Sequence, residues 1–328
     1  MIPPLNVEFP KIVGNTLYMI AGGTIIEEDI SLTAEDIEKL KRIWVLQMSN
    51  YKVLIVGYGT VGQNLARELS ALKPDVYDKY TRLDNRQKIL VDNPDAPKDG
   101  HGGVKMEFKY QKYDLAFICV DTPLNENCGL DTTEVVNAIK ENDAEIYVIK
   151  STVPVETTSF MKIHSGKRIV FSPEYYGGTH HCNNFEFNFT ILGGAKEDCI
   201  AVQQILQECY DARHIFRITD SNTAELVKFM ENSWIATKVS FCNQFYEIAN
   251  DYNIDYEELR ELFILDPRVN PAHTFVYKDH PYWDSHCLNK DVPCIAQNST
   301  AELLRHVIDY NNTQKFLSKI CGENENQS

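Results

Sequence analysis

Short aliphatic runs alternate with amphipathic stretches from Tyr51 to about residue 218. Runs without polar alternation are typical of strands that are covered on both faces of a sheet. We predict strands at Lys52–Gly57, Asp75–Asp78, Leu115–Asp121, Ile146–Lys150, Arg168–Phe171, Thr190–Leu192 and Ile215–Arg217. We predict helices at Thr60–Ala71, Thr132–Asn142 and Lys196–Tyr210. This alternation predicts an α/β fold with a mostly parallel sheet.

The pattern becomes helical after residue 218. Thr223–Tyr252 contains neither Gly nor Pro and reads as one long helix, with Ser221 or Asn222 as its N-cap. A further helix is expected at Asp255–Leu265, an irregular stretch at Arg268–Pro293, and a last helix at Thr300–Lys319, before a polar, frayed tail at Gly322–Ser328. The sequence therefore predicts a helical domain, residues 219–328, built on one long central helix.

Two other regions carry weaker patterns. Residues 1–50 form an N-terminal appendage, with a hairpin in Asn15–Ile26 around Gly22-Gly23 and a helix beginning near Thr33. Between Asp78 and Leu115 we expect loop, with one strand near Lys105–Lys109. The predicted domains are thus 1–50, 51–218 and 219–328.

The charge of the chain limits its partners. Its 328 residues carry 32 Lys and Arg against 47 Asp and Glu, a formal net charge of −15. Such a chain repels nucleic acid and anionic membrane surfaces in bulk. The longest apolar runs, such as Leu115–Val120, are far shorter than the roughly 20 residues that span a bilayer. Neither nucleic acid nor a membrane is expected as a partner.

The cysteines indicate a reducing compartment. Nine are scattered along the chain without the paired spacing of a disulfide framework or a zinc ribbon. The first ten residues lack the features of a secretory signal, so we expect a cytoplasmic protein. Histidines and cysteines at His180-His181-Cys182, and at His280, His286 and Cys287, match no metal-ligand spacing, and no metal is predicted.

A glycine-rich turn follows the first predicted strand and opens a helix. The motif is Gly57-Tyr58-Gly59-Thr60-Val61-Gly62. Its glycines permit a tight turn, approach of a pyrophosphate to the backbone, and close packing of helix on strand. The amides of Thr60 and Val61 lie at the helix N-terminus, which attracts anions. The motif predicts a Rossmann-type domain that binds a dinucleotide.

Asp78 ends the next strand, where a carboxylate can accept both ribose hydroxyls of the cofactor. That carboxylate would repel a 2′-phosphate, which favours NAD over NADP, although Arg82 lies nearby. A glycine turn with a surface Asp is the alternative reading.

Polar clusters follow three predicted strands. They are Cys119-Val120-Asp121-Thr122-Pro123, Lys150-Ser151-Thr152-Val153-Pro154 and Ser172-Pro173-Glu174. Ligands of open α/β sheets bind at the carboxyl ends of the strands, so the three clusters point to one crevice. Taken singly, each is also compatible with a proline-terminated strand.

Two further segments carry reactive side chains. Lys228 and Asn232 lie four residues apart on the long helix and project from one face, although a solvated lysine is the ordinary reading of such a position. Cys287 becomes a strong nucleophile only where positive charge lowers its thiol pKa, and His286, Lys290 or Lys228 can supply it. Asp291 follows four residues later and can hold a water molecule.

In their order, these segments resemble the UDP-glucose/GDP-mannose dehydrogenase family. The resemblance rests on GYGTVG, VDTP, KSTVP, SPE, AELVKFMEN and CLNKD and runs from about Lys52 to about Gln314. It implies oxidation of the C6 alcohol of a nucleotide sugar, such as UDP-glucose, to a carboxylate with two NAD. The long helix looks like the family's dimer-forming helix, so a homodimer is expected.

The resemblance also implies residue roles. Cys287 matches the nucleophile, Lys228 and Asn232 match the pair that stabilises the oxyanion, and Asp291 with Thr122 matches the pair that handles the water and the alcohol proton. Glu174 matches the carboxylate that assists thioester hydrolysis; Thr152 and Glu174 lie where cofactor and substrate meet. Arg268 matches an arginine that reaches the substrate of a neighbouring subunit.

The sequence departs from the family in four respects. Tyr282-Trp283-Asp284-Ser285-His286 stands where the family has a glycine-rich run, and Asn289 replaces a proline. The segment after Asp78 is short. The chain also ends where the family's C-terminal nucleotide-binding domain would begin, so a compact enzyme without that domain is expected. Two alternatives stay open: a two-electron β-hydroxyacid-type dehydrogenase, and a non-catalytic NAD-binding module.

Overall fold

A computed structural model describes residues 7–13, 16–21, 24–29, 51–92, 106–177 and 186–325 of the chain. The first three ranges are strands β1 (Val7–Val13), β2 (Thr16–Ala21) and β3 (Thr24–Asp29), which form a small antiparallel sheet. Pairing of β2 with β3 confirms the predicted hairpin. The helix predicted near Thr33 lies outside the described residues.

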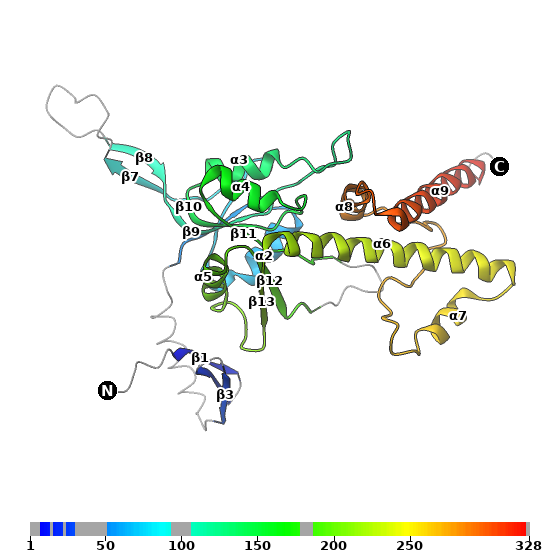
Figure 1. Ribbon diagram of the computed structural model, residues 1–328, viewed down its shortest axis with the longest axis horizontal. Helices are drawn as coiled ribbons and strands as arrows, with labels where there is room; N and C mark the ends of the chain where they lie inside the picture. The colour runs from blue at the N-terminus through cyan, green and yellow to red at the C-terminus, as the bar shows by residue number, and fades with distance from the viewer. Residues whose placement is uncertain are drawn as a thin grey trace.

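An eight-stranded sheet is the main element of the fold (Figure 1). Its order is β13-β12-β11-β10-β9-β4-β5-β6, and all neighbours are parallel except β11–β12 and β5–β6. The strands are β4 (Val53–Val56), β5 (Asp75–Asp78), β6 (Leu83–Asp84), β9 (Tyr113–Ile118), β10 (Ala144–Ile149), β11 (Arg168–Phe171), β12 (Phe189–Gly193) and β13 (Ile215–Thr219). The predicted mostly parallel α/β fold is confirmed.

Alternate residues of the central strands pack on opposite faces of the sheet. Val53 and Ile55 of β4 lie in a core with helices α2 (Thr60–Glu68) and α5 (Lys196–Leu206), with a short 3-10 turn, Ser70–Leu72, after α2. Leu54 and Val56 lie in a second core with α3 (Thr133–Glu141) and α4 (Thr157–Ser165). The sheet is thus covered on both faces, as its aliphatic strands require.

Helix α4 is absent from our sequence prediction, because its cap is supplied by a distant residue. The backbone amides of Glu156 and Thr158 donate to the Glu225 carboxylate at 2.7 and 2.8 Å. Glu225 is fully buried on the long helix, so nothing local in the sequence marks where α4 begins.

The segment after Asp78 also differs from the prediction. Besides the expected strand, now β8 (Met106–Tyr110), it contains β7 (Lys88–Asp92), and the two form an antiparallel hairpin. The Arg86 guanidinium lies 3.6 Å from the ring centre of Tyr77 and 3.8 Å from that of Tyr110. This stacked cation fixes the base of the hairpin against β5. The contact joins residues that are distant in the sequence, so a local sequence pattern could not predict it.

The long helix α6 (Ser221–Asp251) extends from the sheet domain into a helical region (Figure 1). At 1.5 Å per residue its 31 residues span about 46 Å. Its N-cap is Asp220, whose side chain accepts from Thr223 N at 2.9 Å, so the predicted caps Ser221 and Asn222 were wrong. Helices α8 (His286–Ala296) and α9 (Glu302–Glu325) pack against α6, and α7 (Tyr256–Phe263) follows it.

Helix α8 corrects the predicted irregular stretch. Although Pro293 lies inside it, a helix forms there, and Ser285 caps it by accepting from Leu288 N at 3.2 Å. Trp283 fixes the chain just before it: the Trp283 amide donates to Asn311 of α9, and its indole N–H donates to Ser240 of α6 at 3.1 Å. Helix α9 continues to Glu325. The prediction of a frayed tail from Gly322 was therefore wrong for residues 322–325.

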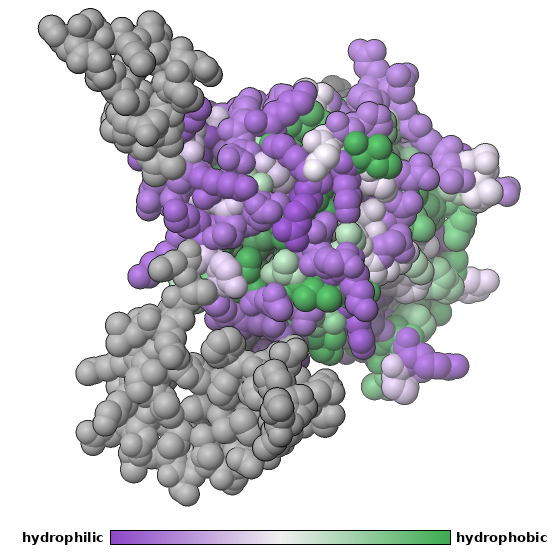
Figure 2. Space-filling view, turned by 60° about the vertical axis from the view of Figure 1, so that its left-hand side comes forward, coloured by the Kyte–Doolittle hydropathy of each residue, from purple (hydrophilic) through white to green (hydrophobic). Residues whose placement is uncertain are grey.

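Hydrophilic residues dominate one face of the molecule. Figure 2 shows a mostly hydrophilic face, on which apolar residues gather only in small patches. Within the part of the chain that the structure describes, none of the helices combines the length and the apolar character that crossing a bilayer requires.

Candidate active site

The glycine-rich turn joins β4 to α2 in a shape that only glycine fits at two positions. Gly57 has φ +93°, and a Cβ there would lie 2.5 Å from the Cys119 carbonyl oxygen. A Cβ on Gly62 would lie 2.0 Å from the Gly57 carbonyl oxygen. Gly59 differs, because no atom of the residues that the structure describes lies within 4 Å of the position of its Cβ, its chain neighbours aside. Open space faces the turn at Gly59, where a pyrophosphate approaches in a Rossmann site.

The start of α2 and the end of β5 complete this turn. No side chain caps α2, so the first-turn amides around Thr60 and Val61 are not taken up by a capping group. Asp78 accepts from Tyr58 N at 2.7 Å through one oxygen and from Thr81 N at 2.7 Å through the other. Burial alone would raise the pKa of Asp78, but these hydrogen bonds outweigh it and lower the pKa. Asp78 is therefore an anion that braces the turn.

Substitution of the two glycines should separate folding from binding. Gly62→Ala places a methyl group against backbone and should lower the free energy of unfolding by about 3 kcal/mol. Gly59→Ala meets open space, so it should unfold at the wild-type denaturant concentration yet bind NAD roughly tenfold more weakly. Urea titration and calorimetry with NAD measure the two quantities. Equal NAD affinity of Gly59→Ala and the wild type would contradict this placement of the cofactor.

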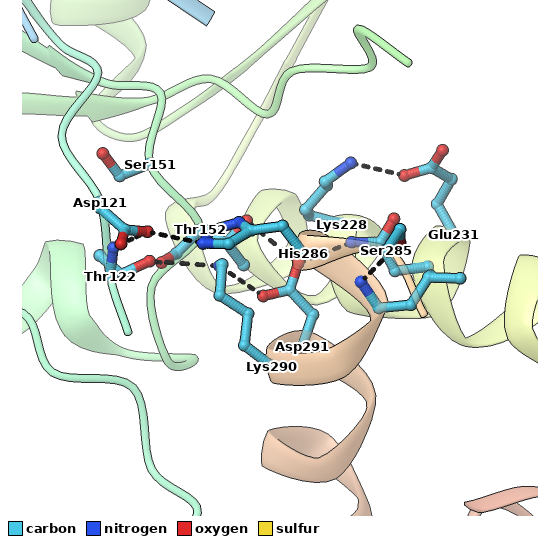
Figure 3. Close-up of polar contacts among 12 residues, drawn as sticks. Asp121, Thr122, Ser151, Thr152, Lys228, Glu231, Ser285, His286, Lys290 and Asp291 are labelled. Atoms are coloured by element: carbon cyan, nitrogen blue, oxygen red, sulfur yellow. Dashed lines mark hydrogen bonds and ion pairs between the residues drawn. The ribbon is translucent and has the colours of Figure 1, made fainter. Parts of the chain in front are cut away.

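Asp291 lies at the centre of the second group of predicted residues (Figure 3). It is fully buried in α8, and its carboxylate accepts from Lys290 Nζ at 2.7 Å and from Asn232 Nδ2 at 2.6 Å. Thr152, after β10, adds a longer hydrogen bond of 3.4 Å. Asp291 thus joins α8, α6 and the carboxyl end of the sheet.

Thr122 lies beside this carboxylate, after β9. Its hydroxyl donates to the Thr152 carbonyl oxygen at 2.8 Å and accepts from Lys290 Nζ at 3.3 Å. Lys290 therefore bridges Asp291 and Thr122, the two residues that the sequence pairs for handling water and a proton.

Lys228 and Asn232 lie on the buried face of α6, which excludes the solvated-lysine reading. Lys228 is 4% exposed, and its Nζ donates to Glu231 at 2.8 Å. Burial alone would lower the pKa of Lys228, but Glu231 and Glu174 raise it above its ordinary value. Lys228 is therefore a permanent cation in a site with little water.

Cys287 lies in the first turn of α8 and is half-buried. Burial raises the pKa of its thiol, Asp291 and Glu174 raise it further, and Lys228 and Lys290 oppose them. The positive charges of Lys228 and Lys290 therefore do not lower the thiol pKa below its ordinary value in the free protein, and the lowering that the sequence suggested is wrong for this state.

Glu174 follows β11 and completes the group. It is buried, accepts from Tyr176 N at 2.8 Å, and acts electrostatically on both Cys287 and Lys228. The residues predicted as catalytic thus come from the segments after two strands, β9 and β11, and from two helices, α6 and α8.

Arg268 lies apart from this group. It is exposed and pairs with Asp266 two residues earlier, so it binds nothing in the site of its own chain. The contact of Arg268 with the substrate of a neighbouring subunit therefore stays a prediction. The His180-His181-Cys182 segment lies outside the described residues; among those described, no cluster of three His, Cys, Asp or Glu side chains has metal-binding geometry.

Sequence reasoning gave no catalytic role to three charged residues of the site. One of them, Lys290, was named only as a possible positive charge near the Cys287 thiol. The three are Lys150, Glu231 and Lys290; Glu231 and Lys290 pair with the assigned Lys228 and Asp291, and Lys150 donates to the two residues before the assigned Glu174. Lys290 and Glu231 lie one and three residues from the assigned Asp291 and Lys228. Helical spacing could have indicated Glu231, which lies at i+3 from Lys228.

Two family models match this chain. The NAD binding domain of the UDP-glucose/GDP-mannose dehydrogenase family matches residues 98–214, and the central domain of that family matches residues 222–313. Together they cover more than half of the chain, and the chain belongs to this family. NAD is accordingly its cofactor, and the open space at Gly59, the uncapped start of α2 and the anionic Asp78 fit it.

Curated relatives act on different sugars, by their names. A UDP-N-acetyl-D-mannosamine dehydrogenase of Methanocaldococcus jannaschii is 29% identical over 225 residues, 65% of this chain and 51% of the relative. A GDP-mannose 6-dehydrogenase of Pseudomonas syringae pv. tomato is 26% identical over 302 residues, 80% of this chain and 68% of the relative. This chain therefore spans about half of the first relative and two thirds of the second.

The fold has close counterparts among solved structures. A UDP-glucose dehydrogenase from the archaeon Pyrobaculum islandicum superposes with a TM-score of 0.61 at 18% sequence identity. The match covers 81% of this chain and 68% of the archaeal one. It supports the arrangement of a Rossmann-type sheet followed by helices around a long central helix.

Proposed function

We propose that the protein is an NAD-dependent nucleotide-sugar 6-dehydrogenase that oxidises a primary alcohol to a carboxylate in two steps. One observation supports the proposal: α8 carries Cys287 one turn before Asp291, whose carboxylate hydrogen-bonds Asn232 of α6 and Thr152 at the carboxyl end of β10. A two-electron dehydrogenase has no use for a thiol in that position, whereas an oxidation that passes the aldehyde needs a nucleophile to capture it.

The chemistry proceeds through Cys287. NAD, when bound at the glycine-rich turn, would supply the hydride acceptor for two successive oxidations, that of the alcohol carbon and that of the thiohemiacetal carbon. Between these oxidations the Cys287 sulfur adds to the aldehyde carbon, and the thiol proton goes to the new hydroxyl oxygen. The second oxidation leaves a thioester and releases that proton. Water then adds to the thioester carbonyl, the C–S bond breaks, and the carboxylate leaves while the thiol is regenerated.

The neighbouring side chains have matching roles in this proposal. Lys228 uses one of its three N–H donors on Glu231, so it has donors left for an oxyanion on the captured carbon. Asn232 lies one turn along α6 from Lys228 and adds a neutral donor. Asp291 with Thr122 accepts the alcohol proton, and Glu174 takes a proton from the attacking water.

Stoichiometry tests the proposal. We expect the purified protein to release two NADH per sugar with one member of a panel of UDP-glucose, UDP-N-acetylmannosamine and GDP-mannose, with UDP-glucose expected from the resemblance. One NADH per molecule of a β-hydroxy acid would indicate a two-electron dehydrogenase instead. Binding of NAD without turnover of any substrate would indicate a non-catalytic module. Absorbance at 340 nm against limiting sugar measures the ratio.

We also propose that α6 forms a homodimer. Large apolar side chains are exposed along one stripe of the helix at Leu226, Met230, Trp234, Phe241, Phe245 and Ile248. Their spacing places them on one face, and an exposed apolar stripe of this length marks an interface. The resemblance to a dimer-forming helix makes a second copy of this chain the expected partner.

A charge in the stripe should therefore dissociate the dimer. We expect Trp234→Glu to elute as a monomer and the wild type as a dimer, with light scattering giving both masses. Phe160→Glu is the matched control, because Phe160 on α4 is as exposed as Trp234 (60% against 61%) but lies outside the stripe. A monomeric wild type would contradict the proposal.

A further inference from the structure

Lys150 is a buried lysine that none of the proposed steps uses. It follows the last residue of β10 and is 9% exposed. Its Nζ donates to the Ser172 hydroxyl at 3.3 Å and to the Pro173 carbonyl oxygen at 3.1 Å. These two acceptors immediately precede Glu174. Lys150 therefore ties the end of β10 to the segment that presents the Glu174 carboxylate.

The charge of Lys150 also acts on Glu174. Burial lowers the pKa of Lys150, and the nearby Glu174 carboxylate is the largest opposing influence. Glu174 also acts electrostatically on Lys228, the second buried lysine of the site, and raises its pKa. The carboxylate thus interacts with two ammonium groups, one hydrogen-bonded to its own segment and one on α6. An ammonium is kept in such a dry place only where an anion and hydrogen-bond acceptors compensate it.

We propose that Lys150 is a positioning residue that holds Glu174 in reach of the thioester on Cys287, and so governs the hydrolytic step. The hydrolytic step in this inference rests on the proposed function. The hydrogen bonds of Lys150 to Ser172 and Pro173 are independent of that function. Two of the three Lys150 donors are used on Ser172 and Pro173, so in this proposal Lys150 has no direct contact with the reacting atoms. It acts through Glu174, which accepts the water proton as water adds to the thioester carbon and the Cys287 sulfur departs.

Lys167 offers a matched control, because it makes the same kind of contacts at the opposite edge of the sheet. Its Nζ donates to the Ile139 carbonyl oxygen at 2.6 Å and to the Tyr147 hydroxyl at 2.7 Å. Loss of either lysine removes a compensated ammonium that joins neighbouring elements. Only the loss of Lys150 should change the chemistry at Cys287.

Rapid kinetics distinguishes positioning from a loss of folded protein. In Lys150→Met the burst of NADH before hydrolysis should keep its amplitude per folded chain, whereas the steady-state rate should fall by roughly tenfold to a hundredfold, the usual effect of a displaced group. Lys150→Arg, which keeps charge and donors, should recover part of the rate. Lys167→Met should leave both burst and steady-state rate per folded chain unchanged. A Lys150→Met variant with the wild-type steady-state rate would overturn the proposal.

A second measurement needs no turnover. Glu174 acts electrostatically on Cys287, so its displacement should change the rate at which iodoacetamide alkylates that thiol, followed by mass spectrometry of the peptide that contains it. Lys150→Met should change this rate in the wild-type background and much less in the Glu174→Gln background. Such non-additivity is the signature of a residue that acts through another.

The two measurements separate the possible failures. Coupling between Lys150 and Glu174 in alkylation, with no NADH from any sugar, would retain the positioning role and reject the dehydrogenase function. Two NADH per sugar with additive effects of Lys150→Met and Glu174→Gln would retain the function and reject the role of Lys150.

Discussion

Replacing Cys287 by alanine should abolish steady-state NADH formation, lowering its rate by roughly a thousandfold or more, the scale on which removal of a covalent nucleophile acts. Without the sulfur, the aldehyde that leaves the first oxidation has no thiol to capture it, and the thioester that hydrolysis needs cannot form. Binding of NAD should stay unchanged, because the glycine-rich turn lies on β4 and α2. Initial rates at saturating NAD measure the loss, and calorimetry measures the binding.

The same helix supplies a control for this variant. Cys294 lies seven residues further along α8, is also half-buried, and has a thiol pKa that burial likewise raises. Cys294→Ala should therefore keep its steady-state rate within about twofold of the wild type. The substitution removes a half-buried thiol from α8, but that thiol has no role in the proposed reaction. A Cys287→Ala variant that retains turnover with one NADH per substrate would remove the need for a thioester and favour a two-electron dehydrogenase.

Replacing Asp291 by alanine should cost stability as well as activity. The carboxylate is fully buried, and its loss leaves the ammonium of Lys290 and the amide of Asn232 without their acceptor. Breaking a buried pair in this way typically costs about 3–5 kcal/mol, because a charge remains uncompensated. We expect the urea midpoint to fall accordingly and the contacts between α8 and the sheet edge to loosen.

A surface aspartate gives the comparison. Asp266 pairs with the exposed Arg268, and Asp266→Ala should leave the urea midpoint nearly unchanged, because solvent screens an exposed pair. Equal losses for Asp266→Ala and Asp291→Ala would show that Asp291 is not the buried centre of the site.

Much of the sheet domain was predictable because its information is local. The aliphatic strands, the glycine-rich turn and the uninterrupted α6 are encoded in short stretches, and each was predicted within a few residues. The predicted division at residues 50 and 218 stays a prediction. Helix α4 was missed because its cap, Glu225, lies on α6, and the β7–β8 hairpin was missed because Arg86 joins it to Tyr77 and Tyr110 through space.

The site was predictable to a different extent. Family motifs named Cys287, Lys228, Asn232, Asp291 and Glu174, but the sequence does not say that Asn232 donates to Asp291 or that Lys150 holds the segment before Glu174. Placing Cys287 in an irregular stretch was wrong, since Ser285 starts a helix there despite Pro293. The sequence alone does not explain why Trp283 stands before Cys287 in place of a glycine. In the structure Trp283 is buried and hydrogen-bonds residues of α6 and α9.

Covalent chemistry at Cys287 is tested most directly by quenching the protein with acid during turnover and measuring the mass of its peptides. With NAD and the accepted nucleotide sugar, the peptide that contains Cys287 should carry the nucleotide-uronyl group as a thioester. The Glu174→Gln variant should accumulate more of it than the wild type. A protein that releases NADH steadily in both forms while the Cys287 peptide stays unmodified would contradict the account.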